Sequence, residues 1–232
     1  MFTQIIDPLD GSKWVGNNKS LTMRWRGGLN YEVAIEQPAT MISWSYQCTL
    51  NEETNTLEGT GSKTEFSQTL YEDAKASFAL NEKRTKLTWT DEKEPDAAEG
   101  LALDAVPYHI VGRYWESDRY GLNIFEPDGF GLYSIYVFEA DPEEITDGES
   151  EETDLTERER VEYQYLCTFD WETNTFTSAD PATIDFESLT IYVEQEKCVS
   201  TATFTLTDES HLVWMDDSGL SGDGVTLEGI LL

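Results

Sequence analysis

The segment Tyr46-Gln-Cys48-Thr-Leu50-Asn-Glu-Glu-Thr-Asn-Thr-Leu57 occurs a second time in this chain, as Tyr165-Leu-Cys167-Thr-Phe169-Asp-Trp-Glu-Thr-Asn-Thr-Phe176. Further on, residues 76–91 match residues 202–216 in the same order. A repeat of this length indicates an internal duplication. It divides the 232 residues into two units, 1–107 and 108–232, each near the usual size of a domain. We expect each unit to fold on its own.

The repeated segments alternate apolar and polar residues with a period of two, which is typical of half-buried strands. In the first copy the apolar set is Trp44, Tyr46, Cys48 and Leu50. The connections are short and turn-like, so neighbouring strands should pair antiparallel in a meander of seven or eight strands per unit. Closing such a sheet removes its exposed edges. We therefore predict an all-β chain with two small β-barrels in tandem, and a β-sandwich is the alternative.

The second unit carries an acidic insertion, Asp141 to Arg160, inside the hairpin between the strands that contain Tyr133 and Tyr163. The segment is dense in carboxylates and has no aromatic residue. This composition predicts a solvated loop. A calcium site or a site for a basic partner is the alternative.

Acidic residues dominate the charged set, with 46 Asp and Glu against 15 Lys and Arg and a net charge of −31. Nucleic acids and anionic membranes are bound through basic patches, so neither is expected as a partner. No apolar run approaches the roughly 20 residues that span a bilayer, so no membrane insertion is expected. The first ten residues lack the pattern of a signal peptide. A self-repelling, soluble monomer is the simplest expectation.

Each unit follows one pattern: Trp/Tyr-x-Tyr-x-Cys-Thr, then Glu-Thr-Asn-Thr, then Phe-x-Leu, Leu-x-Trp-x-Asp and a final Gly-x-x-Leu. This pattern resembles a repeat of uncharacterised secreted or lipid-anchored proteins of Gram-positive gut bacteria. The resemblance implies a small β domain in an extracellular or cell-surface setting, with a cytoplasmic location as the alternative, and it implies no activity. The openings Gly11-Ser-Lys-Trp14 and Gly112-Arg-Tyr-Trp115 also resemble the start of lipocalin-type and avidin-type barrels.

Residue patterns of catalysis are absent from the sequence. The two histidines, His109 and His211, do not stand in a zinc-binding spacing, and no Gly-x-Ser-x-Gly elbow or phosphate-binding loop occurs. The stretch Asp216 to Gly224 has the composition of a calcium loop without its spacing, and a Gly-rich connector is the simpler explanation. A glycosidase needs only two carboxylates at roughly 5 to 10 Å, and a chain with 46 acidic residues offers many candidate pairs. We predict no enzyme, no metal and no cofactor.

The three cysteines are too few for a disulfide framework. Cys48 and Cys167 occupy equivalent positions in the repeat and each stands in an alternating strand pattern, which predicts two buried thiols. Cys198 has no counterpart, and a bridge between Cys167 and Cys198 stays open at this point.

Comparing the tryptophans between the two copies distinguishes those that the fold needs from those that are candidates for ligand binding. Trp14, Trp44 and Trp89 have aromatic partners at the matching positions of the second unit, so packing explains them. Trp25 aligns with Glu126 and Trp171 aligns with Glu52, at a hairpin tip where we expect little burial. An aromatic residue that the fold does without in one copy is available for binding. Trp25 and Trp171 are therefore the candidate ligand-binding residues.

Together these features predict a non-catalytic binding protein whose partner is another protein, a glycan or a small apolar molecule. One alternative is a lipocalin-type carrier of an apolar ligand inside a barrel. The other is a carboxylate-based glycan hydrolase, which only the abundance of acidic residues supports.

Overall fold

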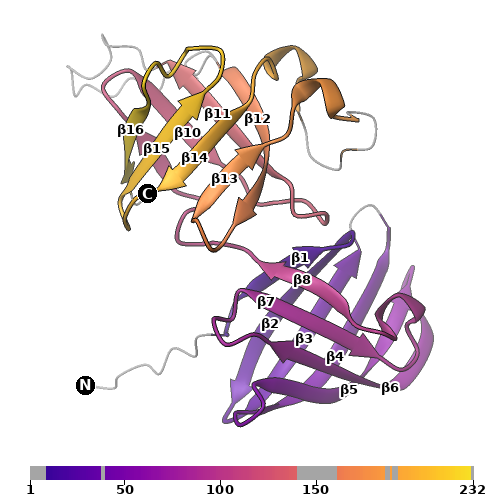
Figure 1. Cartoon of the computed structure of the whole chain (residues 1–232). Coiled ribbons are helices and arrows are strands. Elements are labelled where there is room, and N and C mark those ends of the chain that lie inside the picture. Colours follow the sequence, from indigo (N-terminus) through magenta and orange to yellow (C-terminus); the bar gives the residue numbers. More distant parts are fainter. Residues whose placement is uncertain (1–8, 38–39, 140–160, 186–188, 190–192, 231–232) are drawn as a thin grey trace, which may run out of the picture. The chain divides into compact units, whose positions relative to one another are not determined.

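The computed structural model describes residues 9–37, 40–139, 161–185, 189 and 193–230. The chain forms two compact units, one made of residues 1–106 with 127–131 and the other of 107–126 with 132–232 (Figure 1). Each unit is a closed barrel of eight antiparallel strands. The prediction of two tandem β-barrels is thus confirmed, and each sheet closes on itself as a barrel rather than splitting into the two sheets of a sandwich. The acidic insertion 141–160, with its alternative calcium or partner site, lies outside the described residues.

The first barrel is an uninterrupted meander in which every strand pairs with its neighbours in sequence and β1 closes on β8. Its strands are β1 (Lys13–Gly16), β2 (Lys19–Gly27), β3 (Asn30–Gln37), β4 (Ile42–Asn51), β5 (Thr56–Glu65), β6 (Gln68–Leu80), β7 (Lys86–Asp91) and β8 (Leu101–Ala105). A short 3-10 helix, η1 (Pro95–Ala97), lies in the connection between β7 and β8.

The second barrel repeats this order and closes through the pairing of β16 with β9. Its strands are β9 (Tyr114–Glu116), β10 (Tyr120–Ile124), β11 (Tyr133–Glu139), β12 (Val161–Asp170), β13 (Thr175–Ser178), β14 (Ala202–Leu206), β15 (His211–Asp216) and β16 (Val225–Ile230). Two 3-10 helices, η3 (Pro181–Thr183) and η4 (Gln195–Lys197), lie between β13 and β14.

The apolar residues of the predicted alternating pattern face the barrel interior, and the polar residues between them face outward. On β4, Trp44, Tyr46, Cys48 and Leu50 are all buried, while the residues between them are exposed. The buried rings meet edge to face, for example Tyr46 on Phe78 with centroids 5.4 Å apart. Such contacts between aromatic rings stabilise a core beyond the area that they bury. The interior of the first barrel is therefore occupied by packed aromatic side chains.

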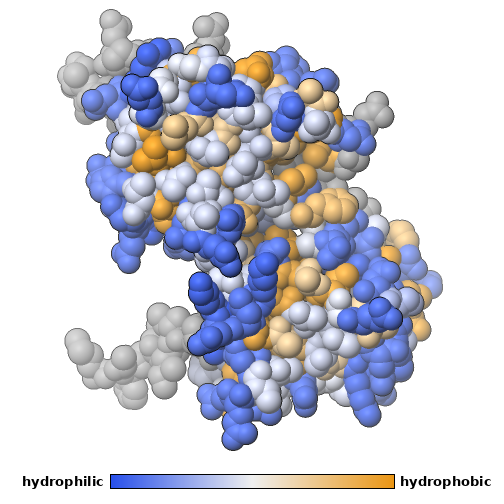
Figure 2. Space-filling view, in the orientation of Figure 1, coloured by the Kyte–Doolittle hydropathy of each residue, from blue (hydrophilic) through white to orange (hydrophobic). Residues whose placement is uncertain are grey.

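All three cysteines are free and buried. This confirms the buried thiols predicted for Cys48 and Cys167, and the structure holds Cys198 as a thiol as well. Figure 2 shows hydrophilic and intermediate side chains over most of the face that it presents, with smaller hydrophobic areas between them. This surface agrees with the acidic composition.

The two barrels differ most where the fifth strand turns into the sixth. In the first unit β5 and β6 form a long hairpin joined by Phe66 and Ser67 alone. In the second unit β13 ends at Ser178 and β14 begins at Ala202, so a long connector replaces the outer part of the hairpin. Among the described residues, the duplication therefore keeps the barrel and changes this hairpin.

The turn of this long hairpin contains a strained residue. Phe66 and Ser67 have φ angles of +47° and +64°, and the Phe66 side chain is 68 % exposed. A left-handed backbone is unfavourable for a bulky residue and suits Asn or Gly. We expect Phe66→Asn to raise the unfolding free energy of the first unit by about 1 kcal/mol, measured by hydrogen exchange of the β5 and β6 amides. The control is Leu70→Asn, at an exposed apolar residue outside the turn, which should not stabilise.

Candidate functional site

The structure places the two sequence-predicted candidates in different units, so each is considered separately. Trp25 lies at the end of β2 in the first unit, on the same strand face as Met23 and Leu21, and is half-buried. Its indole Nε1 donates to the carbonyl oxygen of Gly28 at 2.9 Å. The ring is thereby fixed to its own hairpin turn, and a role in binding stays a prediction.

Trp171 is more enclosed than the sequence suggested. It follows β12 in the second unit and is half-buried, because its ring contacts Phe169 and His109 with centroids 5.2 Å and 5.9 Å away. The expectation of an unburied hairpin tip was wrong, since two neighbouring aromatic side chains contact the indole. The ring serves local packing, and its use in binding also stays a prediction.

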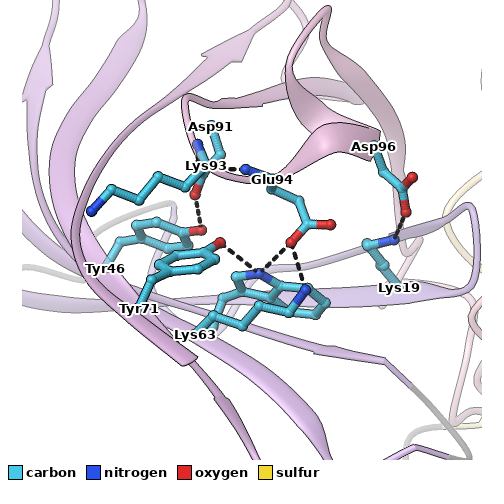
Figure 3. A network of polar contacts seen from close by, with 9 residues as sticks. Lys19, Tyr46, Lys63, Tyr71, Asp91, Lys93, Glu94 and Asp96 are labelled. Atoms are coloured by element: carbon cyan, nitrogen blue, oxygen red, sulfur yellow. Dashed lines mark hydrogen bonds and ion pairs between the residues drawn. The ribbon is translucent and has the colours of Figure 1, made fainter. Parts of the chain in front are cut away.

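A polar network lies at one end of the first barrel and was not predicted from the sequence (Figure 3). Asp91, at the end of β7, is fully buried and its Oδ2 accepts the hydroxyl proton of Tyr46 at 2.5 Å. Its Oδ1 accepts the backbone N–H groups of Lys93 and Glu94 at 2.6 Å and 3.1 Å. A carboxylate buried in this way must have all its oxygens paired, and here it fixes the start of the β7–β8 connection.

Glu94 continues the network toward the barrel wall. Its Oε2 accepts the indole N–H of Trp44 at 3.1 Å and the ammonium group of Lys63 at 2.8 Å. Trp44 Nε1 also lies 3.1 Å from the hydroxyl oxygen of Tyr71, and Lys63 Nζ lies 4.9 Å from the centre of the Trp44 ring. We call these six residues the end network: Trp44, Tyr46, Lys63, Tyr71, Asp91 and Glu94.

A β-bulge in β6 decides which residue enters the end network. Gly61 pairs with Ala74, but Lys63 pairs with Tyr71, so β6 has one residue more than β5 over this interval. Asp73, inside the interval, has φ +55°. An extra residue reverses the alternation of a strand. Tyr71 therefore faces the interior beside Lys63, where regular alternation would have placed Glu72, and Glu72 and Asp73 face outward.

The second unit retains half of this arrangement. Tyr165 donates its hydroxyl proton to Asp216 Oδ2 at 2.7 Å, as Tyr46 does to Asp91. Burial raises the pKa of Tyr165 and of Tyr46, and the hydrogen-bonded aspartate raises both further. Gly219 follows Asp216 at the distance at which Glu94 follows Asp91. The tyrosine–aspartate pair therefore belongs to the shared scaffold, and the lysine–glutamate pair belongs to the first unit.

On the outside of the same wall lies a groove of about 330 Å³ between β4, β5 and β6. We call it the outer groove, and its lining residues are Ser45, Gln47, Thr60, Gly61, Ser62, Glu72 and Asp73. Ser45 and Gln47 point away from the core because Trp44 and Tyr46, which alternate with them, point into it. The bulge supplies the two carboxylates. The outer groove and the end network are thus opposite sides of one distorted piece of sheet.

Six of the seven lining residues have side chains that can form hydrogen bonds. In the part of the chain that the structure describes, none of these six side chains has a hydrogen-bond partner. Four of them supply hydroxyl or amide groups, and Glu72 and Asp73 supply carboxylates. The lining contains no cation. Such a surface can donate and accept several hydrogen bonds and can attract one positive group.

The buried thiol of Cys48 on β4 predicts how the unfolding free energy depends on pH. Burial raises the pKa of Cys48 to about 12 from 9.0. Above pH 9 the unfolded chain loses this proton while the folded chain keeps it, so the unfolding free energy should fall as the pH rises from 9 toward 12. Urea unfolding across this range should show a shallower fall for Cys48→Ala. A folded-state thiol that titrates near 9 would contradict the burial. Burial also raises the pKa of Tyr71 to about 12, which adds to the fall in both proteins.

Within the described residues, no group of three or more His, Cys, Asp or Glu side chains is placed to hold a metal ion. Among the same residues, no helix has the length and apolar character that crossing a membrane requires. No model of a known protein family matches the sequence, and neither a curated protein nor a solved structure matches it. The functional argument therefore rests on the geometry of the chain itself.

Two signals in the sequence could have revealed part of this site. Asp91 stands two residues after Trp89 and four after Leu87 on one alternating strand, which predicts a carboxylate facing the core. Gln47 aligns with Leu166, so the outward faces of the two copies differ in polarity at this position. The bulge at Asp73 had no comparable signal.

Proposed function

We propose that this chain is a non-catalytic binding protein and that its ligand occupies the outer groove of the first unit. The observation that carries the proposal is the set of six exposed or half-buried polar side chains that line one groove without a partner in the described structure. Polar groups that fold stability does not use are free to determine which ligand binds. The resemblance of the repeat to secreted and lipid-anchored proteins supports an extracellular or cell-surface setting.

The state of the potential nucleophiles and carboxylates supports binding rather than catalysis. Burial raises the pKa of Cys48 to about 12 and of Cys198 to about 11, and a glutamate beside Cys198 adds to the second shift, so both are neutral thiols near neutral pH. The carboxylates of Asp91 and Glu94 are engaged by the groups of the end network. The carboxylates that do reach the outer groove are those of Glu72 and Asp73, and there they can attract a positive group of a ligand.

The filled interior of the first barrel favours an external site over an enclosed apolar ligand. Trp14, Trp44 and Trp89 are at most 2 % exposed, and the ring centroids of Trp44 and Trp89 lie 5.5 Å apart. A carrier of the lipocalin type needs interior space that its side chains leave open. These rings take up the inward-facing positions along several strands.

The proposal is tested by binding to arrays of immobilised glycans and peptides. The blocking variant is Ser45→Trp, which fills the groove from an exposed position and leaves the core unchanged. The control is Ala79→Trp, an exposed position on β6 outside the groove. We expect at least one ligand class to bind the wild type and Ala79→Trp and to be lost in Ser45→Trp. Equal binding of every ligand by the three proteins would contradict the proposal.

A further inference from the structure

The second unit covers with its own chain the surface that the first unit leaves open. Gln164 and Leu166 on β12 match Ser45 and Gln47 on β4 and have the same outward parity. Each of the two is only 2 % exposed, whereas Ser45 and Gln47 are exposed. The outward face is therefore buried on β12 in the second unit and exposed to solvent on β4 in the first.

The cover in the second unit is a stretch of the connector between β13 and β14. The backbone N–H of Glu194 donates to Oε1 of Gln164 at 2.7 Å, and η4 packs beside β12. Glu194 has an extended backbone, with φ −89° and ψ 113°. A side-chain amide on the outer face thus holds the main chain of a crossing peptide. The first unit has no such connector, because two residues join β5 to β6.

The outer groove has the groups to hold a peptide in the same way. Gln47 carries an amide that can both donate to and accept from a main chain, and Ser45, Thr60 and Ser62 add hydroxyl groups. At the bulge, Glu72 and Asp73 bring two carboxylates to the lining, and the ammonium group of the exposed Lys93 donates to the carbonyl oxygen of Glu72 at 2.6 Å. Lys75, exposed and paired with Thr60, lies on the same outer face farther along β6. The two carboxylates outnumber the ammonium group of Lys93 at the bulge end, so a basic side chain of a ligand is attracted there and is repelled by Lys75 at the other end.

We propose that the outer groove binds an extended peptide segment of another protein, with one lysine or arginine of that segment placed against Glu72 and Asp73. This inference rests on the proposed function and narrows its ligand to a peptide. The main chain of the ligand bonds to the amide and hydroxyl groups, and its basic side chain makes charge-assisted hydrogen bonds at the bulge. The net charge of −31 favours the approach of a basic partner.

The test uses the full chain and a phage-displayed library of linear heptapeptides. Peptides are selected on the wild type and counter-selected on Ser45→Trp, and the enriched peptides are synthesised for fluorescence anisotropy. We expect enrichment of Lys and Arg over the starting library. We expect Glu72→Gln with Asp73→Asn to weaken binding at least tenfold, and Ala79→Trp to change it less than twofold. Asn tolerates the left-handed backbone of position 73, so the double variant should keep the bulge.

The outcomes separate this inference from the proposed function. Selection of basic peptides that lose affinity in the double carboxylate variant supports both. Failure to enrich any peptide, together with a glycan whose binding is lost in Ser45→Trp, overturns the peptide inference and leaves the groove as the binding surface. Enriched peptides that are indifferent to the carboxylates also overturn it. If every peptide selected on the wild type before the counter-selection step, and every glycan, binds Ser45→Trp as it binds the wild type, both proposals are overturned.

Discussion

Replacing Asp91 by alanine should lower the unfolding free energy of the first unit by about 3 kcal/mol or more. The substitution removes the acceptor for the Tyr46 hydroxyl and for the N–H groups of Lys93 and Glu94, and it leaves the first and the last of these donors buried and that of Lys93 partly buried. Each buried donor without a partner costs about 1–3 kcal/mol. Hydrogen exchange read by mass spectrometry, with peptides from β4 and β7 followed separately, measures the loss within this unit.

Two variants serve as controls for Asp91→Ala. Asp91→Asn keeps an oxygen for the two backbone N–H groups and a donor for the Tyr46 oxygen, so its loss should be smaller. Asp216→Ala removes the matching carboxylate of the second unit, where the aspartate is half-exposed and water can replace it. A loss for Asp216→Ala as large as that for Asp91→Ala would show that burial does not set the cost.

Replacing Gly61 by alanine should destabilise the first unit by about 3 kcal/mol. A Cβ atom at this position would lie 2.2 Å from the carbonyl oxygen of Ser45 and 2.4 Å from the Tyr46 ring. Backbone cannot yield as the end of a flexible side chain can, so β4 and β5 must separate locally. We expect faster exchange of the β4 and β5 amides and a lower midpoint of the first unit in urea.

The matched control for Gly61→Ala is Ser62→Ala at the next residue on β5, whose side chain forms no hydrogen bond with the described residues. Its effect should stay within about 0.5 kcal/mol. Unchanged exchange in Gly61→Ala would mean that β4 and β5 are less closely apposed than the structure shows. Because Gly61 also lines the groove, the same variant should reduce ligand binding.

The fold was predictable from the sequence because apolar and polar residues alternate regularly along its strands. The alternation from Trp44 to Leu50 is sufficient to define β4 and its buried face, and the repeat applies the same reading to β12. Closure into a barrel required more, because it depends on pairings between strands far apart in sequence, such as Trp14 with Ala105. A barrel was favoured because closing the sheet removes its exposed edges, whereas the register between paired strands is known only from the structure.

The candidate site was less predictable, and the reasons are local. Alternation predicts Glu72 on the inner face of β6, and only the extra residue at Asp73 places Tyr71 there instead. Trp171 was judged from its hairpin position, but Phe169 and His109 make contacts with its ring that no periodicity encodes. The outer groove exists because no connector among the described residues covers the outward face of β4. Only the comparison with β12, whose outward face is covered, reveals this difference between the two units.

The most direct test of the binding surface is the map of amide chemical shifts when the full chain is titrated with an enriched heptapeptide. The proposed site predicts shifts concentrated in β4, β5 and β6, with the largest at Ser45, Gln47 and Asp73, and none of these shifts in Ser45→Trp. Shifts confined to the second unit, or to the ends of the first barrel with the outer groove unchanged, would contradict it.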